Sequence, residues 1–352
     1  MFTTELSYQL PNELIAQSPS KCRDQSRLLL YNRDSNQFSH HFFSELKDIL
    51  PPGLAIFRND VSVLKARLFG VRSSGGSVEC LLLRCADKST NTWKCLLKPG
   101  RKTSKAQSFG RPNEYSAKVI ESLPGGEYLV QFHLIKDIDP PALAQRLGKL
   151  PLPPYVRRPA NEEDELRYQT VYGKKEQRTA IAAPTAGLHF TPQILRSLVK
   201  SGHSIHDLTL SVGIGTFRPI ESERVEDHPM HAEDYTLIPS TKRVLRDTQI
   251  KKLAVGTTTV RTIEHFLLKD DAHPEQTTRA ETNLFIRPPY SFLGVDHLLT
   301  NFHLPGSTLL CLVAAFIDNE NTDGLAKLKE LYSEAIEKKY RFFSYGDAML
   351  IL

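Results

Sequence analysis

The arrangement of apolar residues between positions 66 and 132 is the feature that most constrains the fold. These residues form five short strand-like runs, at 66–70, 78–83, 93–97, 117–120 and 128–132. Gly, Ser, Asn and Pro residues that favour turns separate the runs. Short strands with turn signals at regular spacing indicate a small all-β barrel or sandwich.

A different pattern follows the proline-rich segment 150–155, which is too stiff to continue a strand or a helix. Three loops, at 183–190, 256–259 and 300–307, each lead into a helical pattern. Strand–loop–helix units place their loops along one edge of a sheet, where α/β proteins bind ligands. We therefore predict an α/β main domain, discontinuous over 1–62 and 150–352, with a small all-β, barrel-like domain inserted at 63–149.

The three expected helices have recognisable ends. We expect Thr191, Thr259 and Ser307 to cap their N-termini, because hydroxyl side chains bind free N–H groups there. Gly202 is the expected stop of the first helix. The apolar residues of that helix predict a buried stripe of Ile194, Leu195, Leu198 and Val199.

The charge of the chain is unevenly distributed. The net charge is +5 overall, yet residues 61–125 contain twelve Lys or Arg and four Asp or Glu, a net charge of +8. A basic block in an otherwise slightly acidic protein is typical of a surface that neutralises phosphates. Its densest part is 98–105, where the alternative interpretation is a solvated loop.

Several classes of protein are excluded. The longest apolar run, 309–317, is far shorter than the roughly 20 residues of a membrane helix. Nothing at the start reads as a signal peptide. The five cysteines are scattered without C-x-x-C spacing, so we expect neither disulfides nor a zinc site, and no metal. These features predict a cytoplasmic protein.

The loops contain candidates for chemistry but no common nucleotide motif. Gly213 and Gly215 lack a third glycine, and no P-loop is present. The segment 228–233 contains two histidines and a carboxylate, which can act as acid and base or form a polar loop. His189 precedes a helix N-terminus, which favours the neutral imidazole. Hydroxyls at 257–259 and the amide of Asn301 can orient a ligand or cap helices.

Many segments in order resemble one family. They are 24–28, 98–102, 150–155, 167–172, 183–190, 213–219, 254–261, 300–305 and 340–349. Together they resemble the S-adenosylmethionine:tRNA ribosyltransferase-isomerases of queuosine synthesis. The resemblance implies an α/β domain with an inserted β-barrel. It also implies transfer of the ribosyl part of S-adenosylmethionine to 7-aminomethyl-7-deazaguanine in the tRNA anticodon, which gives epoxyqueuosine and releases adenine and methionine.

The resemblance also implies roles for individual residues. The acid–base candidates are His189, His231, Glu233 and His303. The candidates for binding S-adenosylmethionine are Thr185, Gly187, Arg218, Thr257, Thr258, Arg261, Asn301, Arg341 and Asp347. Those for binding the anticodon stem-loop are Arg67, Lys98, Arg101, Lys102 and Lys105. No cofactor is expected beyond the consumed S-adenosylmethionine, no membrane partner is expected, and the expected state is a monomer or weak oligomer.

The chain departs from the family pattern at a few positions, namely Val61, Ser62, Lys65, Ser211 and Ala232. Loss of a polar contact to a charged group costs roughly 1.5–3 kcal/mol. Two interpretations therefore stay open: the transferase, and a tRNA- and nucleotide-binding homologue with reduced or lost turnover. A methyltransferase would instead release S-adenosylhomocysteine.

Overall fold

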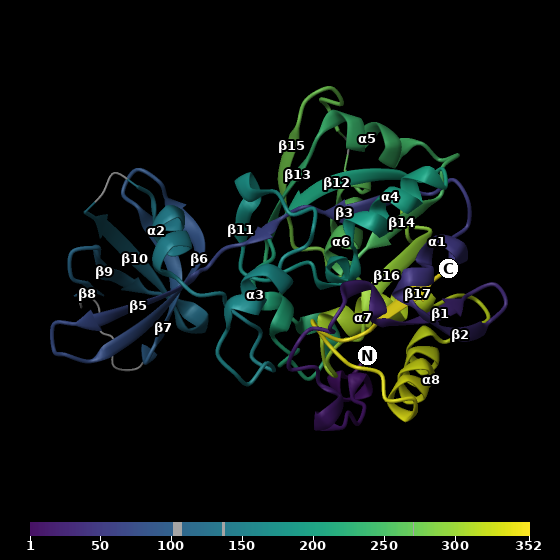
Figure 1. Ribbon diagram of the computed structural model, residues 1–352, viewed down its shortest axis with the longest axis horizontal. Helices are drawn as coiled ribbons and strands as arrows, with labels where there is room; N and C mark the ends of the chain where they lie inside the picture. The colour runs from purple at the N-terminus through teal and green to yellow at the C-terminus, as the bar shows by residue number, and fades with distance from the viewer. Residues whose placement is uncertain (101–107, 136–137, 270) are drawn as a thin grey trace.

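The computed structural model describes residues 1–100, 108–135, 138–269 and 271–352. A closed barrel lies on one side of the molecule, and a larger part built on a nine-stranded sheet contains both termini (Figure 1). The predicted fold class, an α/β part with an inserted all-β barrel, is confirmed. Within the described residues, none of the helices combines the length and apolar character needed to cross a membrane.

The barrel consists of six antiparallel strands in the order β10-β7-β6-β5-β8-β9. The strands are β5 (Arg67–Arg72), β6 (Ser77–Asp87), β7 (Thr92–Lys98), β8 (Ser108–Arg111), β9 (Tyr115–Ser122) and β10 (Glu127–Leu134). Five of them coincide with the apolar runs of the sequence. The sequence analysis missed β8, because only Phe109 among its four residues points into the core. Helix α2 (Pro140–Leu147) contributes Leu143 and Ala144 to the same core.

The large sheet has the strand order β15-β13-β12-β3-β14-β16-β17-β1-β2. Its strands are β1 (Arg27–Asn32), β2 (Gln37–Phe42), β3 (Ala55–Asn59), β12 (Ser204–Leu210), β13 (Glu233–Leu237), β14 (Lys252–Val255), β15 (Thr278–Thr282), β16 (His297–Asn301) and β17 (Ala348–Ile351). The four central strands β12, β3, β14 and β16 are parallel. Their carboxyl ends therefore meet at one edge of the sheet.

Helices cover both faces of this sheet. Side chains of β14 point alternately to the two faces. Ala254 packs on one face with α6 (Thr257–Leu267), α7 (Thr308–Ile317) and α8 (Gly324–Glu337). Leu253 and Val255 pack on the other face with α1 (Leu46–Ile49) and α4 (Pro192–Lys200). Two further helices are α3 (Glu162–Arg167) and α5 (Pro239–Arg246). Apolar burial on both faces is the arrangement expected of parallel strands.

The expected helix ends are correct for two of the three helices. Thr191 accepts a hydrogen bond from the Ile194 N–H, and Ser307 accepts one from the Leu310 N–H. The expectation for Thr259 was wrong. The N-cap is Gly256, three residues earlier, and the Thr259 hydroxyl donates instead to the Val255 carbonyl at 2.7 Å.

Two other expectations also need correction. Val199 is 54% exposed, because the buried stripe of α4 is narrow and centred on Ile194 and Leu198. The first of the three units does not contribute its strand to the large sheet. That strand, β11 (Arg178–Ala180), pairs with β4 (Ser62–Val63) in a separate two-stranded sheet near the barrel (Figure 1).

Candidate functional site

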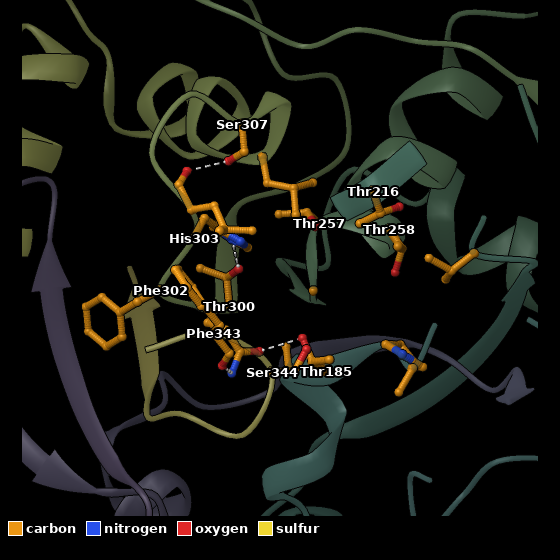
Figure 2. Close-up of a pocket in the computed structure, with 18 of the residues that line it drawn as sticks. Thr185, Thr216, Thr257, Thr258, Thr300, Phe302, His303, Ser307, Phe343 and Ser344 are labelled. Carbon is orange, nitrogen blue, oxygen red and sulfur yellow. Dashed lines mark hydrogen bonds between the residues drawn. The ribbon is translucent and has the colours of Figure 1, made fainter. Parts of the chain in front are cut away.

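A two-lobed crevice lies at the carboxyl edge of the parallel strands. We call the first lobe the threonine lobe; its polar lining includes Thr185, Thr257, Thr258, Thr300, Asn301 and His303 (Figure 2). The second, the histidine lobe, is lined by residues that include His228, Met230, His231, Glu233, Arg261 and Phe285. Thr216 and Leu309 line both lobes, so the two lobes adjoin. Including space open to solvent, they hold about 600 and 440 Å³.

The topology explains why the three predicted loops meet here. Thr185 begins the 3-10 helix η8 (Thr185–His189), Thr257 follows β14, and Asn301 ends β16. Gly256 joins β14 to α6 with φ of 88°, a left-handed conformation that other residues adopt only with strain. This turn places Thr257 and Thr258 in the first turn of α6, where both line the threonine lobe.

The threonine lobe contains no Asp, Glu, Lys or Arg among the described residues that line it. Its polar groups are hydroxyls, one amide and the imidazole of His303. Ion-pair recognition is therefore replaced there by hydrogen bonds and by the dipoles of the helix ends.

A chain of hydrogen bonds runs from the threonine lobe into the core behind it. The Thr185 hydroxyl donates to Asn301 Oδ1 at 3.1 Å, and Asn301 Nδ2 lies 3.2 Å from His189 Nε2. The amide nitrogen also faces the carbonyls of Phe343 and Asp347, which fixes the amide orientation. Asn301 therefore donates to Nε2, and His189 Nδ1–H donates to the Ser26 hydroxyl at 2.9 Å.

His189 thus supports the site from behind. It is 3% exposed and does not line either lobe. Burial, together with the smaller effect of repulsion from Arg23 and Arg341, lowers its pKa to about 3. The neutral form expected from the sequence is correct, but loss of hydration, not the helix end, is the main cause. With both ring nitrogens in hydrogen bonds, His189 positions Asn301.

We expect His189 to make stability depend on pH. Its pKa is about 3 in the folded chain, against an ordinary value of 6.5. As the pH falls below 6.5, the unfolded chain therefore takes up the proton and the folded chain does not. This histidine alone should lower the free energy of unfolding by about 2 kcal/mol between pH 7 and pH 5. Urea unfolding of His189→Gln should show a correspondingly smaller loss; an identical loss would contradict this assignment.

His303 lines the threonine lobe directly and is also neutral. Its Nε2 lies 2.8 Å from the Thr300 hydroxyl, and its main-chain N–H donates to the Tyr332 hydroxyl. Burial lowers the pKa of His303 to about 3. Among the described residues, Nδ1 has no hydrogen-bond partner. When Nε2–H donates to Thr300, Nδ1 therefore has a free lone pair.

Glu233 and Arg261 form a buried ion pair in the histidine lobe. Glu233 Oε1 also accepts hydrogen bonds from the Gly213 N–H and the Thr216 hydroxyl. The Arg261 guanidinium donates further to the carbonyls of Thr282 and Leu284. The pair therefore holds the loop 213–216 against strand β15. Little of either group's hydrogen-bonding capacity is left for a ligand.

His231 is exposed at the mouth of the histidine lobe. Its ring lies over Gly215, where a Cβ would come within 2.5 Å of His231 Cδ2. Glycine at this position therefore lets the imidazole approach the loop. His228 lies beside it, and burial and the neighbouring His231 lower the pKa of His228.

The candidates Gly187, Arg341 and Asp347 also lie outside both lobes. Gly187 packs against Tyr172, whose hydroxyl a Cβ at this position would meet at 2.0 Å. The Asp347 carboxylate accepts the main-chain N–H groups of Arg27 and Arg341 and pairs with the Arg27 guanidinium. These contacts hold the C-terminal segment against β1, and they direct the Asp347 carboxylate away from the crevice.

The two tRNA-binding candidates that the structure describes lie on barrel strands. Arg67 pairs with Glu79, and Lys98 is exposed at the end of β7. Arg218, a candidate for binding S-adenosylmethionine, approaches the barrel turn at Gly125, where a Cβ would lie 3.9 Å from its guanidinium. Arg101, Lys102 and Lys105 lie outside the described residues.

The sequence analysis did not single out several residues that line the threonine lobe, among them Tyr155, Thr216, Thr300 and Ser344. Thr300 directly precedes Asn301, so its place at the strand end was an available signal. No local signal marks Tyr155, which comes from the proline-rich segment. Within the described residues, no cluster of three or more His, Cys, Asp or Glu side chains has the arrangement of a metal site.

Comparison with known proteins gives a consistent result. The family model described as "Queuosine biosynthesis protein" matches residues 3–351. The S-adenosylmethionine:tRNA ribosyltransferase-isomerase of Sulfurimonas denitrificans is 43% identical over 357 residues, covering 100% of this chain and 98% of the relative. That of Thermotoga maritima is 43% identical over 356 residues, covering 100% of both.

A solved structure is also similar over almost the full length. It is the crystal structure of the S-adenosylmethionine tRNA ribosyltransferase from Thermotoga maritima. The superposition covers 99% of this chain and 100% of that one, with a TM-score of 0.53 and 35% identity.

Proposed function

Since the chain belongs to the queuosine biosynthesis protein family, we propose that its crevice binds S-adenosylmethionine and transfers the ribosyl group to tRNA. The acceptor is 7-aminomethyl-7-deazaguanine in the anticodon, the product is epoxyqueuosine, and adenine and methionine are released. The observation that supports this site best is the threonine lobe, where three separate loops bring hydroxyls, an amide and a neutral imidazole together without a charged side chain.

An uncharged lobe suits the first chemical step. The sulfonium acidifies the adjacent C5′–H of the ribose, and loss of that proton neutralises the sulfonium centre as an ylide. A carboxylate beside the sulfonium would stabilise the charged substrate and oppose this step. When a neutral imidazole takes the proton, one positive charge moves within the lobe and its total charge stays the same.

We assign the role of general base to His303. It lines the threonine lobe, and its Nδ1 has no partner among the described residues. The other candidates are less suitable, because Glu233 is saturated by three donors and His189 by two partners. His231, exposed at the second lobe, is the candidate donor that assists departure of adenine.

The barrel is the proposed tRNA-binding domain, with boundaries at 63 and 149. Lys118 of β9 pairs in register with Gln131 of β10, and Lys94 of β7 pairs with Leu129, two residues before Gln131. Both lysines are exposed and, among the described residues, form no ion pair. Arg84 lies opposite Lys94 and contacts Asp234 and Glu281 on the large sheet. This row of cations therefore crosses the barrel towards the histidine lobe.

The double variant Lys94→Ala/Lys118→Ala is expected to weaken tRNA binding. It should also reduce the slope of log K against log salt by roughly 1 to 2, since each lost phosphate contact removes released counterions. Filter binding at several salt concentrations measures the slope. A matched control, Lys200→Ala/Lys329→Ala, removes two cations from α4 and α8, far from the barrel (Figure 1). Equal slopes for the wild-type protein and the two double variants would reject the barrel surface as the tRNA-binding site.

Release of adenine tests the function itself. The purified chain is incubated with S-adenosylmethionine and tRNA that contains the aminomethyl base. We expect free adenine and methionine. Binding of tRNA without adenine would support the binding homologue, and S-adenosylhomocysteine would support a methyltransferase. The departures from the family pattern leave the proposed crevice intact, because neither lobe is lined by Val61, Ser62, Lys65, Ser211 or Ala232.

The remaining expectations follow from this proposal. S-adenosylmethionine is consumed, so no further cofactor is required for the reaction. The enzyme acts in the cytoplasm, where its tRNA substrate is present.

A further inference from the structure

The N-termini of two helices open into the threonine lobe. The first turn of α6 contributes Thr257 and Thr258 to the lining, and the start of α7 contributes Ser307 and Leu309. The first N–H groups of a helix have no partner within it, and the aligned peptide dipoles add partial positive charge there. Two such ends at one cavity attract a negative group.

The two helix ends differ in how they are capped. Ser307 caps α7 and accepts the Leu310 N–H at 3.2 Å. The N-cap of α6 is Gly256, which has no side chain to accept a hydrogen bond. The N–H groups of Thr259 and Val260 donate to the Gly256 carbonyl. The N–H groups of Thr257 and Thr258 therefore stay available at the lobe.

Thr257 adds an independent observation. Its side chain is only 6% exposed, lines the lobe, and has no hydrogen-bond partner among the described residues. The hydroxyls of two other threonines in α6 do have partners. The Thr258 hydroxyl accepts a hydrogen bond from the Asn59 side-chain amide at 3.5 Å, and the Thr262 hydroxyl donates to the Thr258 carbonyl. In Figure 2, Thr257 lies between two groups of side chains of the lobe, with Ser307 and His303 on one side and Thr216 and Thr258 on the other. A hydroxyl that lines a cavity and has no protein partner among the described residues is free to bind a ligand atom.

The charge of the lobe narrows the class of ligand. No cationic side chain lines it among the described residues, and the nearby Arg261 is occupied by Glu233 and two carbonyls. Phosphates of tRNA are exposed along the backbone and are normally met by Lys and Arg. A small carboxylate that enters a mostly buried lobe needs only N–H and hydroxyl donors.

We propose that the N-terminus of α6, together with the Thr257 hydroxyl, binds the methionyl carboxylate of S-adenosylmethionine. This inference rests on the proposed function, and the carboxylate is the only anionic group of that substrate. The site therefore recognises the methionine end without an arginine. It discriminates S-adenosylmethionine from sulfonium nucleosides that lack the carboxylate.

Decarboxylated S-adenosylmethionine is the probe that tests this inference. We expect the wild-type protein to bind S-adenosylmethionine at least about 10-fold more tightly than the decarboxylated form, as befits hydrogen bonds to a charged group. Thr257→Val should reduce that ratio several-fold, whereas Thr257→Ser, which keeps the hydroxyl, should retain it. Thr241→Val is the matched control, because Thr241 is also buried but lines neither lobe and its hydroxyl donates to the Asp207 carbonyl, so the ratio should stay unchanged.

Each contrary outcome has a distinct meaning. Equal affinities of the wild-type protein for the two nucleosides, or equal weakening of both by Thr257→Val, would overturn the carboxylate site. An effect of Thr257→Val on the KM for tRNA alone would also overturn it and identify a phosphate as the bound anion. Failure of the proposed function appears separately, as absence of adenine release by the wild-type protein, and equilibrium binding still measures the ratio.

Discussion

Replacing His303 by alanine is expected to lower kcat for adenine release by about 10²- to 10⁴-fold, the usual contribution of a positioned general base. The imidazole lines the threonine lobe, is held by Thr300 through Nε2, and is neutral because burial lowers its pKa to about 3. Binding of S-adenosylmethionine should change little, since the loss affects proton transfer. Single-turnover kinetics with modified tRNA measures the step.

Deuterium exchange separates a base from a structural residue. In deuterated water the wild-type enzyme should place deuterium at C5′ of S-adenosylmethionine, and His303→Ala should not. The matched control is His203→Gln, because His203 is also buried but accepts only the Leu54 N–H, far from the crevice. Normal turnover by His303→Ala would exclude His303 as the base.

The pH dependence gives a second check. A base must be unprotonated, so kcat should be lost only as the pH falls towards the folded pKa of His303, about 3. No loss with an apparent pKa near 6.5 is expected from this group. If kcat of the wild-type enzyme did fall in this pH range and that of His231→Ala did not, His231 would be the general base instead of His303.

Replacing Glu233 by alanine is expected to lower the free energy of unfolding by about 3–5 kcal/mol. Both members of the Glu233–Arg261 pair are less than 10% exposed, so the change leaves a buried guanidinium without its counter-ion. The loop 213–216 also loses two of its anchors, the hydrogen bonds of Gly213 and Thr216. Urea unfolding at pH 7 measures the loss.

A surface pair and a double variant act as controls for this effect. Glu281→Ala removes an exposed carboxylate that contacts Arg84, and it should cost about 1 kcal/mol or less. Glu233→Leu/Arg261→Met removes both buried charges and should recover much of the stability lost by Glu233→Ala. A double variant no more stable than Glu233→Ala would show that the ion pair is not the cause.

The division of the fold was predictable because it depends on local patterns. Period-two burial and turn residues mark the barrel strands, and hydroxyl caps mark α4 and α7. Local patterns did not predict the elements whose bounds or partners are set by tertiary contacts. Strand β8 has a single core residue, and α6 begins at Thr257 because Gly256 adopts a positive φ. Strand β11 pairs with β4 rather than with the large sheet, and no local property reveals a distant partner.

The candidate site shows the same limit. The parallel pairing of β14 and β16 brings Thr257 and Asn301 together, as the loop positions had suggested, whereas Thr185 joins them by its hydrogen bond to Asn301 and not through a strand of the large sheet. The sequence does not reveal the chain of hydrogen bonds from Asn301 through His189 to Ser26, because Ser26 lies 163 residues from His189. Residue type alone cannot distinguish a histidine that faces a ligand from one that supports the wall behind it.

A crystal structure with an unreactive S-adenosylmethionine analogue tests the central claim most directly. The account predicts the nucleoside in the threonine lobe, with C5′ beside Nδ1 of His303 and the methionyl carboxylate at the start of α6. Density for the analogue away from both η8 and the turn at Gly256 would contradict it.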